Sequence, residues 1–315
     1  MEFNLYYNNN QNCLQRVLSA MLIRKNIDPN QLWYQSGIYY TDSNDASSWE
    51  INPYFMEYDY FLKNMGIECS SFLLPTSEDT ISKIKEYINK DNTIGVYVDI
   101  SELPYCLYYQ KEHESHAIEI IEIKKDIVTL CDHYYNYYGT ISLQQLHLAI
   151  RSYIEHISNL CTIFFLSIDQ DIKINVAECI NNNIEVMNGK KIGTYSLKKE
   201  GSIGLSAIPK VRSKIISLLN LEHPDKFSYL DKLFKDIKEI AYSRYNFNVF
   251  LDSHQYSIDS EYSTELSNNW SVIANLILKS AVTNKTEIVL PNIEKRFNNI
   301  IDQEGNRLIR LEKLI

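Results

Sequence analysis

The six cysteines of this chain lack the close spacing that metal sites and redox motifs need. No two of them form a Cys-x-x-Cys pair, which excludes a zinc knuckle and a thioredoxin motif. No stretch approaches the roughly 18 to 20 apolar residues that cross a bilayer. The first residues hold neither a basic region nor an apolar core typical of a signal peptide. We therefore expect a cytoplasmic protein with free thiols and no membrane partner.

Basic charge is scarce in the first half of the chain. Residues 1–168 hold 11 Lys and Arg against 21 Asp and Glu, a balance of −10, whereas residues 169–315 hold 20 against 19, a balance of +1. A bulk nucleic-acid binder would carry the opposite sign, so no nucleic-acid partner is expected. An acidic region around a site would attract a cationic substrate such as an amine. An ordinary acidic surface would give the same balance.

The order of the predicted elements indicates an α+β protein with two domains. Residues 1–168 begin with a helical pattern at 13–23, and helical patterns follow at 54–65, 77–89 and 142–150. Strand patterns occupy residues 67–74, 93–100, 116–123, 126–131 and 159–168. Residues 26–60 are polar and aromatic, and we expect a surface excursion there. From residue 169 onward helical spacing dominates, with candidates at 176–187, 203–219, 229–246, 263–282 and 293–315. We therefore expect a first domain at 1–168 and a helical domain at 169–315.

Cys13 stands directly before an apolar run with helical spacing. Apolar residues recur at positions 13, 14, 17, 18, 21 and 22, and either Asn12 or Asn10 can serve as the N-cap. Cys13 then falls in the first turn, where the helix dipole favours a thiolate. The alternative is a cysteine that only packs in the core.

A histidine and an aspartate follow Cys13 in the order typical of papain-like cysteine enzymes. His116 begins one strand pattern and Asp132 ends the next, and antiparallel pairing would bring these two ends together. Such an enzyme needs a thiolate, an imidazole base and a group that orients the base. We predict Cys13, His116 and Asp132 for these roles. His133 and His113 remain alternatives for the base.

An acyl-transfer site also needs donors for the developing oxyanion. The backbone N–H of Cys13 is one candidate. Asn8, Asn10 and Gln11 are the side-chain candidates, and neighbouring Asn9 and Asn12 are available as well. The sequence does not choose among these amides.

The chain resembles a known family at these residues. It is similar to the C39-peptidase-like, papain-fold family represented by the N-terminal domain of butirosin biosynthesis protein H. The matching stretches are residues 12–15, 95–105, 115–121 and 128–132, followed by 204–209, 244–251 and Trp270 in the helical half. Papain-like proteases usually place a Gln six residues before the Cys, and here that position is Tyr7. This departure leaves the second oxyanion donor open.

The resemblance implies a papain-like catalytic domain with a helical companion domain and an acyltransferase activity. Members move an acyl group from a carrier-protein thioester onto an amine in natural-product biosynthesis. The expected partners are therefore an acyl or peptidyl carrier protein, which bears phosphopantetheine, and a small amine. No other cofactor and no metal are expected. The alternatives are a cysteine peptidase or thioesterase and a non-catalytic binding protein that keeps the fold.

A basic segment in the second half is a candidate docking surface for an acidic carrier. Residues 190–214 hold seven Lys and Arg against one Glu, a balance of +6. We predict Lys198, Lys199, Lys210 and Arg212 as docking residues. A solvated loop and helix face would give the same pattern.

Overall fold

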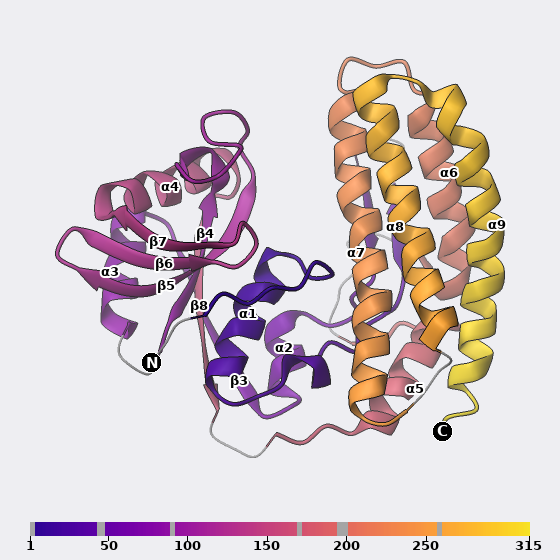
Figure 1. The fold of residues 1–315 in the computed structure, drawn as a ribbon, viewed down its shortest axis with the longest axis horizontal. Helices are drawn as coiled ribbons and strands as arrows, with labels where there is room; N and C mark the ends of the chain where they lie inside the picture. The colour runs from indigo at the N-terminus through magenta and orange to yellow at the C-terminus, as the bar shows by residue number, and fades with distance from the viewer. Residues whose placement is uncertain (1–3, 43–47, 89–91, 169–171, 194–200, 257–259) are drawn as a thin grey trace. The chain divides into compact units, whose positions relative to one another are not determined.

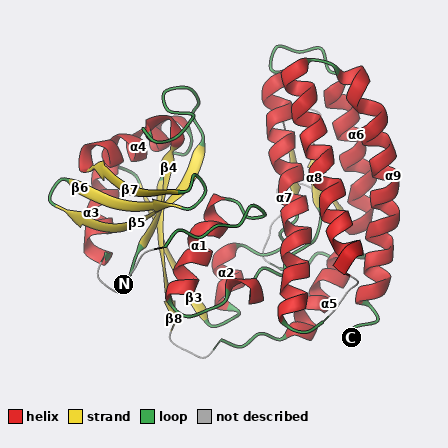
Figure 2. Cartoon of the chain, in the orientation of Figure 1, coloured by secondary structure: helices red, strands yellow, loops and turns green. Residues whose placement is uncertain are grey.

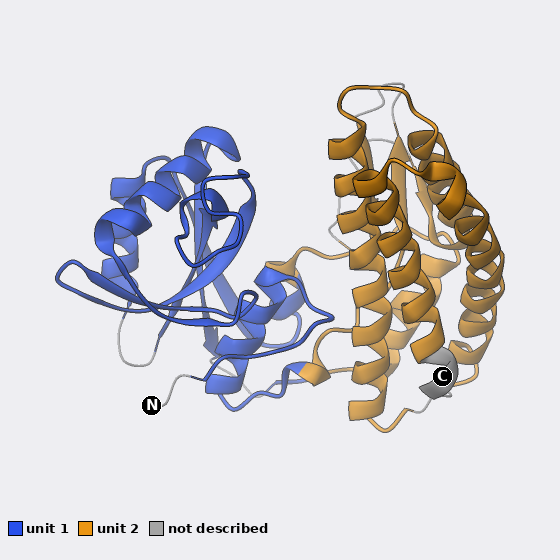
Figure 3. Cartoon of the chain, turned by 45° about the horizontal axis from the view of Figure 1, so that its top comes forward, with its two compact units in different colours: residues 1–29, 61–173 blue, residues 30–60, 174–315 orange. Residues whose placement is uncertain are grey.

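The computed structural model describes residues 4–42, 48–88, 92–168, 172–193, 201–256 and 260–315. The chain divides into two compact units, which Figure 3 shows in different colours. Unit 1 comprises residues 1–29 and 61–173, and unit 2 comprises residues 30–60 and 174–315. Antiparallel sheets and helices occur together, which confirms the expected α+β class (Figure 2). None of the helices in these residues has the length and apolar character needed to cross a bilayer.

Unit 1 is built on a six-stranded antiparallel sheet with the strand order β3-β8-β4-β5-β6-β7 (Figure 1). The strands are β3 (Ile67–Leu74), β4 (Ile94–Asp99), β5 (Ser115–Lys124), β6 (Ile127–Asp132), β7 (Tyr137–Ser142) and β8 (Cys161–Ile168). The helices are α1 (Cys13–Arg24), α3 (Ser77–Tyr87) and α4 (Leu143–His156), and a short 3-10 helix, η2, spans Ile100–Glu102.

The two faces of this sheet pack against different helices. Ile118 and Ile120 of β5 belong to the apolar core that includes Ile84 of α3 and Leu146 of α4. Side chains alternate between faces along a strand, so Glu119 points the other way. Glu119 contacts Arg24 at the end of α1. Helix α1 therefore lies on the face opposite α3 and α4.

The hairpin predicted near residue 125 is present. Strands β5 and β6 pair in antiparallel register, with Glu119 opposite Cys131. Lys125 takes a positive φ of 52° at the turn. Strand β7 was not predicted, because the tyrosine-rich residues from 134 onward resemble a loop in composition.

Unit 2 is mainly helical. It contains α5 (Val176–Met187), α6 (Ala207–Leu219), α7 (Lys226–Ser253), α8 (Ser260–Thr283) and α9 (Thr286–Leu311), with α6 to α9 running alongside one another (Figure 1). The predicted helix at 176–187 is confirmed, and the other four predictions fall on α6 to α9 with ends that differ by several residues. The remaining elements are η1 (Pro29–Gln31), η3 (Gly204–Ser206) and a small sheet of β1 (Tyr39–Asp42), β2 (Trp49–Asn52) and β9 (Ser202–Ile203). Helix α2 (Tyr58–Lys63) spans the division between the units.

Residues 30–60, expected within the first domain, belong to unit 2. Their buried side chains explain this assignment: Ile38 and Phe55 are fully buried. Arg244 of α7 also donates hydrogen bonds from Nη1 to the Gly37 carbonyl and the Ser36 hydroxyl, each at 3.0 Å. A buried guanidinium needs such partners. The segment is therefore a core component of unit 2 and not a surface excursion.

Candidate active site

Cys13 is the first residue of α1, as the sequence predicts. Asn12 is the N-cap: its side chain accepts from the Gln15 N–H at 2.9 Å, and the Gln15 side chain accepts from the Asn12 N–H at 3.2 Å. This reciprocal pair satisfies two helix-end donors and fixes where the helix begins. The half-buried Cys13 thiol therefore lies at the positive end of the helix dipole.

His116 and Asp132 meet where β5 begins and β6 ends. The His116 Nε2 atom lies 2.8 Å from Asp132 Oδ2, and both side chains are buried. Cys13 is a neighbour of the same ring, and its side chain raises the pKa of His116. Because Asp132 contacts Nε2, Nδ1 is the ring nitrogen that is left for a second partner. The three predicted residues are thus connected in the order Cys13, His116, Asp132.

Asp132 is held as an oriented acceptor. Its Oδ1 accepts from the backbone N–H groups of Tyr134 and Tyr135, each at 3.0 Å, and Oδ2 also accepts from the Tyr105 hydroxyl at 3.1 Å. Burial raises the pKa of the Asp132 carboxyl, but the charge of His116 and these hydrogen bonds hold it below its usual value. Asp132 is therefore negative at neutral pH.

The protonation of His116 follows from its neighbours. Burial lowers the pKa of this imidazole, but the Asp132 carboxylate and, after it, Cys13 outweigh burial and raise the pKa to about 10. His116 is therefore an imidazolium at neutral pH. In cysteine enzymes a neighbouring imidazolium favours the thiolate, which is the nucleophilic form of cysteine.

The two alternative bases have other partners. His133 is buried, with Nδ1 accepting from the Tyr6 N–H at 3.0 Å and Nε2 at 2.8 Å from Glu119. His113 lies 2.6 Å from Asp99 through Nδ1 and is half exposed. The ring contacts of these two histidines in the described residues do not include Cys13. Of these three histidines, His116 is therefore the candidate base for Cys13.

Gln11 stands out among the oxyanion candidates. Its side chain is fully buried, its Oε1 accepts from Ser19 at 3.1 Å, and its Nε2 has no partner among the described residues. A buried amide without a partner costs about 1 to 3 kcal/mol. By contrast, Asn8 accepts from the Asn10 N–H at 2.9 Å and donates to Tyr6. Gln11 Nε2 is therefore a buried, unsatisfied donor two residues before Cys13.

The position where papain-like proteases usually have Gln cannot supply that amide. Tyr7 is 65% exposed, and its hydroxyl accepts from Asn9 at 2.7 Å. Its ring lies 5.8 Å from the guanidinium of Arg16. Gln11 thus offers an amide from a different position in the segment before α1.

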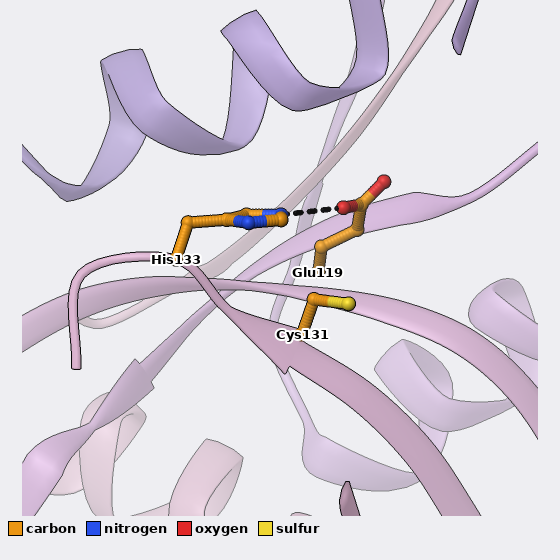
Figure 4. Close-up of side chains that lie close together, drawn as sticks. All are labelled: Glu119, Cys131 and His133. Atoms are coloured by element: carbon orange, nitrogen blue, oxygen red, sulfur yellow. Dashed lines mark hydrogen bonds and ion pairs between the residues drawn. The ribbon is translucent and has the colours of Figure 1, made fainter. Parts of the chain in front are cut away.

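Sequence reasoning missed a second polar cluster beneath α1. The side chains of Glu119, Cys131 and His133 lie close together (Figure 4), and one possible ligand atom of each lies within 4.8 Å of the other two. Arg24 and Thr93 also contact Glu119. The signal in the sequence is Glu119, an acidic residue within the apolar run of β5. A carboxylate is buried in such a run only when other groups pair with its charge.

This second cluster does not fit a metal ion. Both ring nitrogens of His133 are engaged, and Glu119 is already paired with Arg24. Burial raises the pKa of the Cys131 thiol to about 11. The cluster is therefore a buried hydrogen-bonding network.

The predicted docking residues are described only in part. Lys198 and Lys199 lie outside the described residues. Lys210 is exposed on α6, and Arg212 lies 3.8 Å from Glu294. Lys214 of the same basic segment is buried and pairs with Asp42 at 3.1 Å. The docking surface stays a prediction.

No family model and no curated protein matches this chain.

Proposed function

We propose that the chain is a papain-like, cysteine-dependent acyltransferase that forms amide bonds. The observation that carries this proposal is the arrangement of the half-buried Cys13 beside the buried His116–Asp132 pair. It supplies a nucleophile at a helix start, an imidazolium and an orienting carboxylate. These are the groups that acyl transfer through a thioester intermediate requires.

The first half-reaction forms an acyl-enzyme. The Cys13 thiolate attacks the carbonyl carbon of a carrier-bound thioester, and a tetrahedral oxyanion forms. When this intermediate collapses, the carbon–sulfur bond to the phosphopantetheine arm breaks. The His116 imidazolium gives its proton to the departing thiolate. The products are acyl-Cys13, a free carrier thiol and a neutral His116.

The second half-reaction transfers the acyl group to an amine. The neutral amine attacks acyl-Cys13, and His116 takes the proton that the nitrogen loses. Collapse releases the amide and returns the Cys13 thiolate beside the His116 imidazolium. Asp132 fixes the ring and stabilises its charged form throughout. The cycle balances without an oxidant, a reductant or a cofactor beyond the phosphopantetheine of the carrier.

The proposed mechanism needs N–H donors for the oxyanion. We assign one to the backbone of Cys13 and the other to Nε2 of Gln11, whose burial without a partner supports the role. A substrate oxygen bound there would satisfy the amide. Such donors stabilise the transition state most when no reorganisation is needed at the moment of reaction.

Shielding of His116 supports transfer to an amine over hydrolysis. The His116 side chain is buried, and the rings of Tyr134 and Tyr135 lie 5.8 and 5.0 Å from it. Excluding water protects a reactive acyl intermediate. The −10 balance of residues 1–168 suits a cationic acceptor. The resemblance to the butirosin family, and to the cysteine-protease-like amidotransferase of closthioamide biosynthesis, points to the same reaction class.

Intact-protein mass spectrometry tests this function. We expect an N-acetylcysteamine thioester to add one acyl group to the wild-type chain, and an added amine to discharge it as an amide. Cys13→Ala should gain no acyl group, whereas Cys69→Ala, which changes another half-buried thiol, should behave as the wild type. Release of free acid alone, with every amine tested, would favour a peptidase or thioesterase. The absence of any adduct would favour a non-catalytic binding protein.

A further inference from the structure

The second buried cluster is linked to the segment that carries Cys13. His133 directly follows Asp132, and its Nδ1 accepts from the backbone N–H of Tyr6 at 3.0 Å. A nitrogen that accepts a hydrogen bond carries no proton, so the proton of the neutral ring is on Nε2. That Nε2–H points to Glu119 at 2.8 Å. The ring thus has one arrangement in which both of its contacts are satisfied.

The surroundings keep His133 neutral. Burial is the largest cause and the positive charge of Arg24 the next, and the pKa of His133 is lowered to about 3. The groups that face the ring are Glu119, Arg24 and Arg16, together with neighbouring Asp132. The Tyr6–His133 hydrogen bond therefore persists across the pH range in which enzymes work.

The backbone of His133 makes a second link to the same segment. Arg16, one turn after Cys13, donates from Nη1 to the His133 carbonyl at 3.2 Å and from Nε to the Gln11 carbonyl at 3.1 Å. The end of β6, which holds Asp132, is thereby hydrogen-bonded to residues before and after Cys13 in the chain, namely Tyr6 and Arg16. Glu119 anchors the other side of the ring through Arg24, the last residue of α1.

We propose that His133 is a positioning residue that sets the place of Cys13 relative to His116 and Asp132. This inference rests on the proposed function only in that Cys13 is the nucleophile. His133 touches neither the substrate nor the reacting sulfur. Its effect runs through the Tyr6 backbone, and a shift of about 1 Å at a reacting group can cost about 100-fold in rate.

Two substitutions separate positioning from simple packing. In His133→Asn the side-chain oxygen can still accept from the Tyr6 N–H, but the side chain is too short for Glu119. In His133→Gln the amide can still donate to Glu119, but the acceptor for Tyr6 is lost. Glu119 keeps Arg24 and Thr93 in both variants. The two variants therefore each remove one of the two contacts.

The measurement is the rate of iodoacetamide alkylation of Cys13 at pH 7, divided by the rate at Cys69 in the same molecule. We expect His133→Gln to lower this ratio by about 10- to 100-fold and His133→Asn to change it by less than about 3-fold. Tyr6→Pro, which removes the donor N–H without touching His133, should behave as His133→Gln. Acylation by the thioester should follow the same order through kcat, with little change in KM.

Equal effects of the Asn and Gln variants, or a larger effect of Asn, would overturn the positioning role. An unchanged ratio in Tyr6→Pro would overturn it as well, and this variant decides the matter if the His133 variants do not fold. Alkylation needs no acyl donor. If the wild type forms no acyl adduct, the proposed acyl transfer fails while the alkylation ratios still test the positioning of Cys13.

Discussion

Replacing Cys13 with alanine should lower the aminolysis of an N-acetylcysteamine thioester by more than about 1,000-fold. The reason is that in the proposed mechanism the Cys13 thiolate forms the covalent intermediate, and neither His116 nor Asp132 replaces it there. The fold should persist, because Asn12 and Gln15 form the cap of α1 without the sulfur. Amide formation followed by chromatography measures the effect, and far-ultraviolet circular dichroism checks the fold.

Cys69→Ala is the matched control. Cys69 is half-buried as Cys13 is, but it lies within β3 and not at a helix start. Its replacement should leave the rate within about 2-fold of the wild type, since Cys69 is not one of the residues proposed to react. Full activity in Cys13→Ala would remove the nucleophile assignment.

The second large effect is expected at His116. His116→Ala should lower kcat/KM for the same thioester by about 1,000-fold or more, because both half-reactions move a proton through this ring. Asp132→Asn should be less severe at neutral pH. The pKa of His116 is raised to about 10 with the carboxylate in place. Without the carboxylate, burial dominates and the pKa of His116 should fall. The alkaline limb of the pH–rate profile should therefore shift to lower pH.

His113→Ala is the control for this second prediction. His113 also pairs with a buried aspartate, Asp99, at 2.6 Å. Because its ring serves that contact and not Cys13, its loss should leave kcat within a few-fold of the wild type. An inactive His113→Ala combined with an active His116→Ala would transfer the base assignment to His113.

Local signals in the sequence predict much of unit 1. Apolar spacing, with Asn12 or Asn10 as the N-cap, predicts where α1 begins, and the two β-branched runs around residue 125 predict the β5–β6 hairpin. From that hairpin the meeting of His116 and Asp132 follows by antiparallel pairing alone. These features depend on residues close together in the chain or on a single strand pairing.

The features that the sequence did not predict depend on distant packing. Residues 30–60 are polar in composition, yet Arg244 and buried side chains such as Phe55 place them in unit 2. The proposal of Gln11 over Asn8 and Asn10 depends on which amide is buried without a partner, and that is a property of the packed segment. The neutrality of His133 likewise arises from burial and from Arg24. Periodicity carries no information on any of these.

The most direct test of the central claim compares two thiols in one molecule. Cys13 and Cys69 are both half-buried, but only Cys13 has a helix start and His116 beside it. Peptide mapping after brief iodoacetamide treatment at pH 7, well below the His116 pKa of about 10, should find Cys13 labelled at least about 10-fold faster than Cys69. His116→Ala should remove that difference. Equal labelling of the two cysteines in the wild type would contradict an activated Cys13.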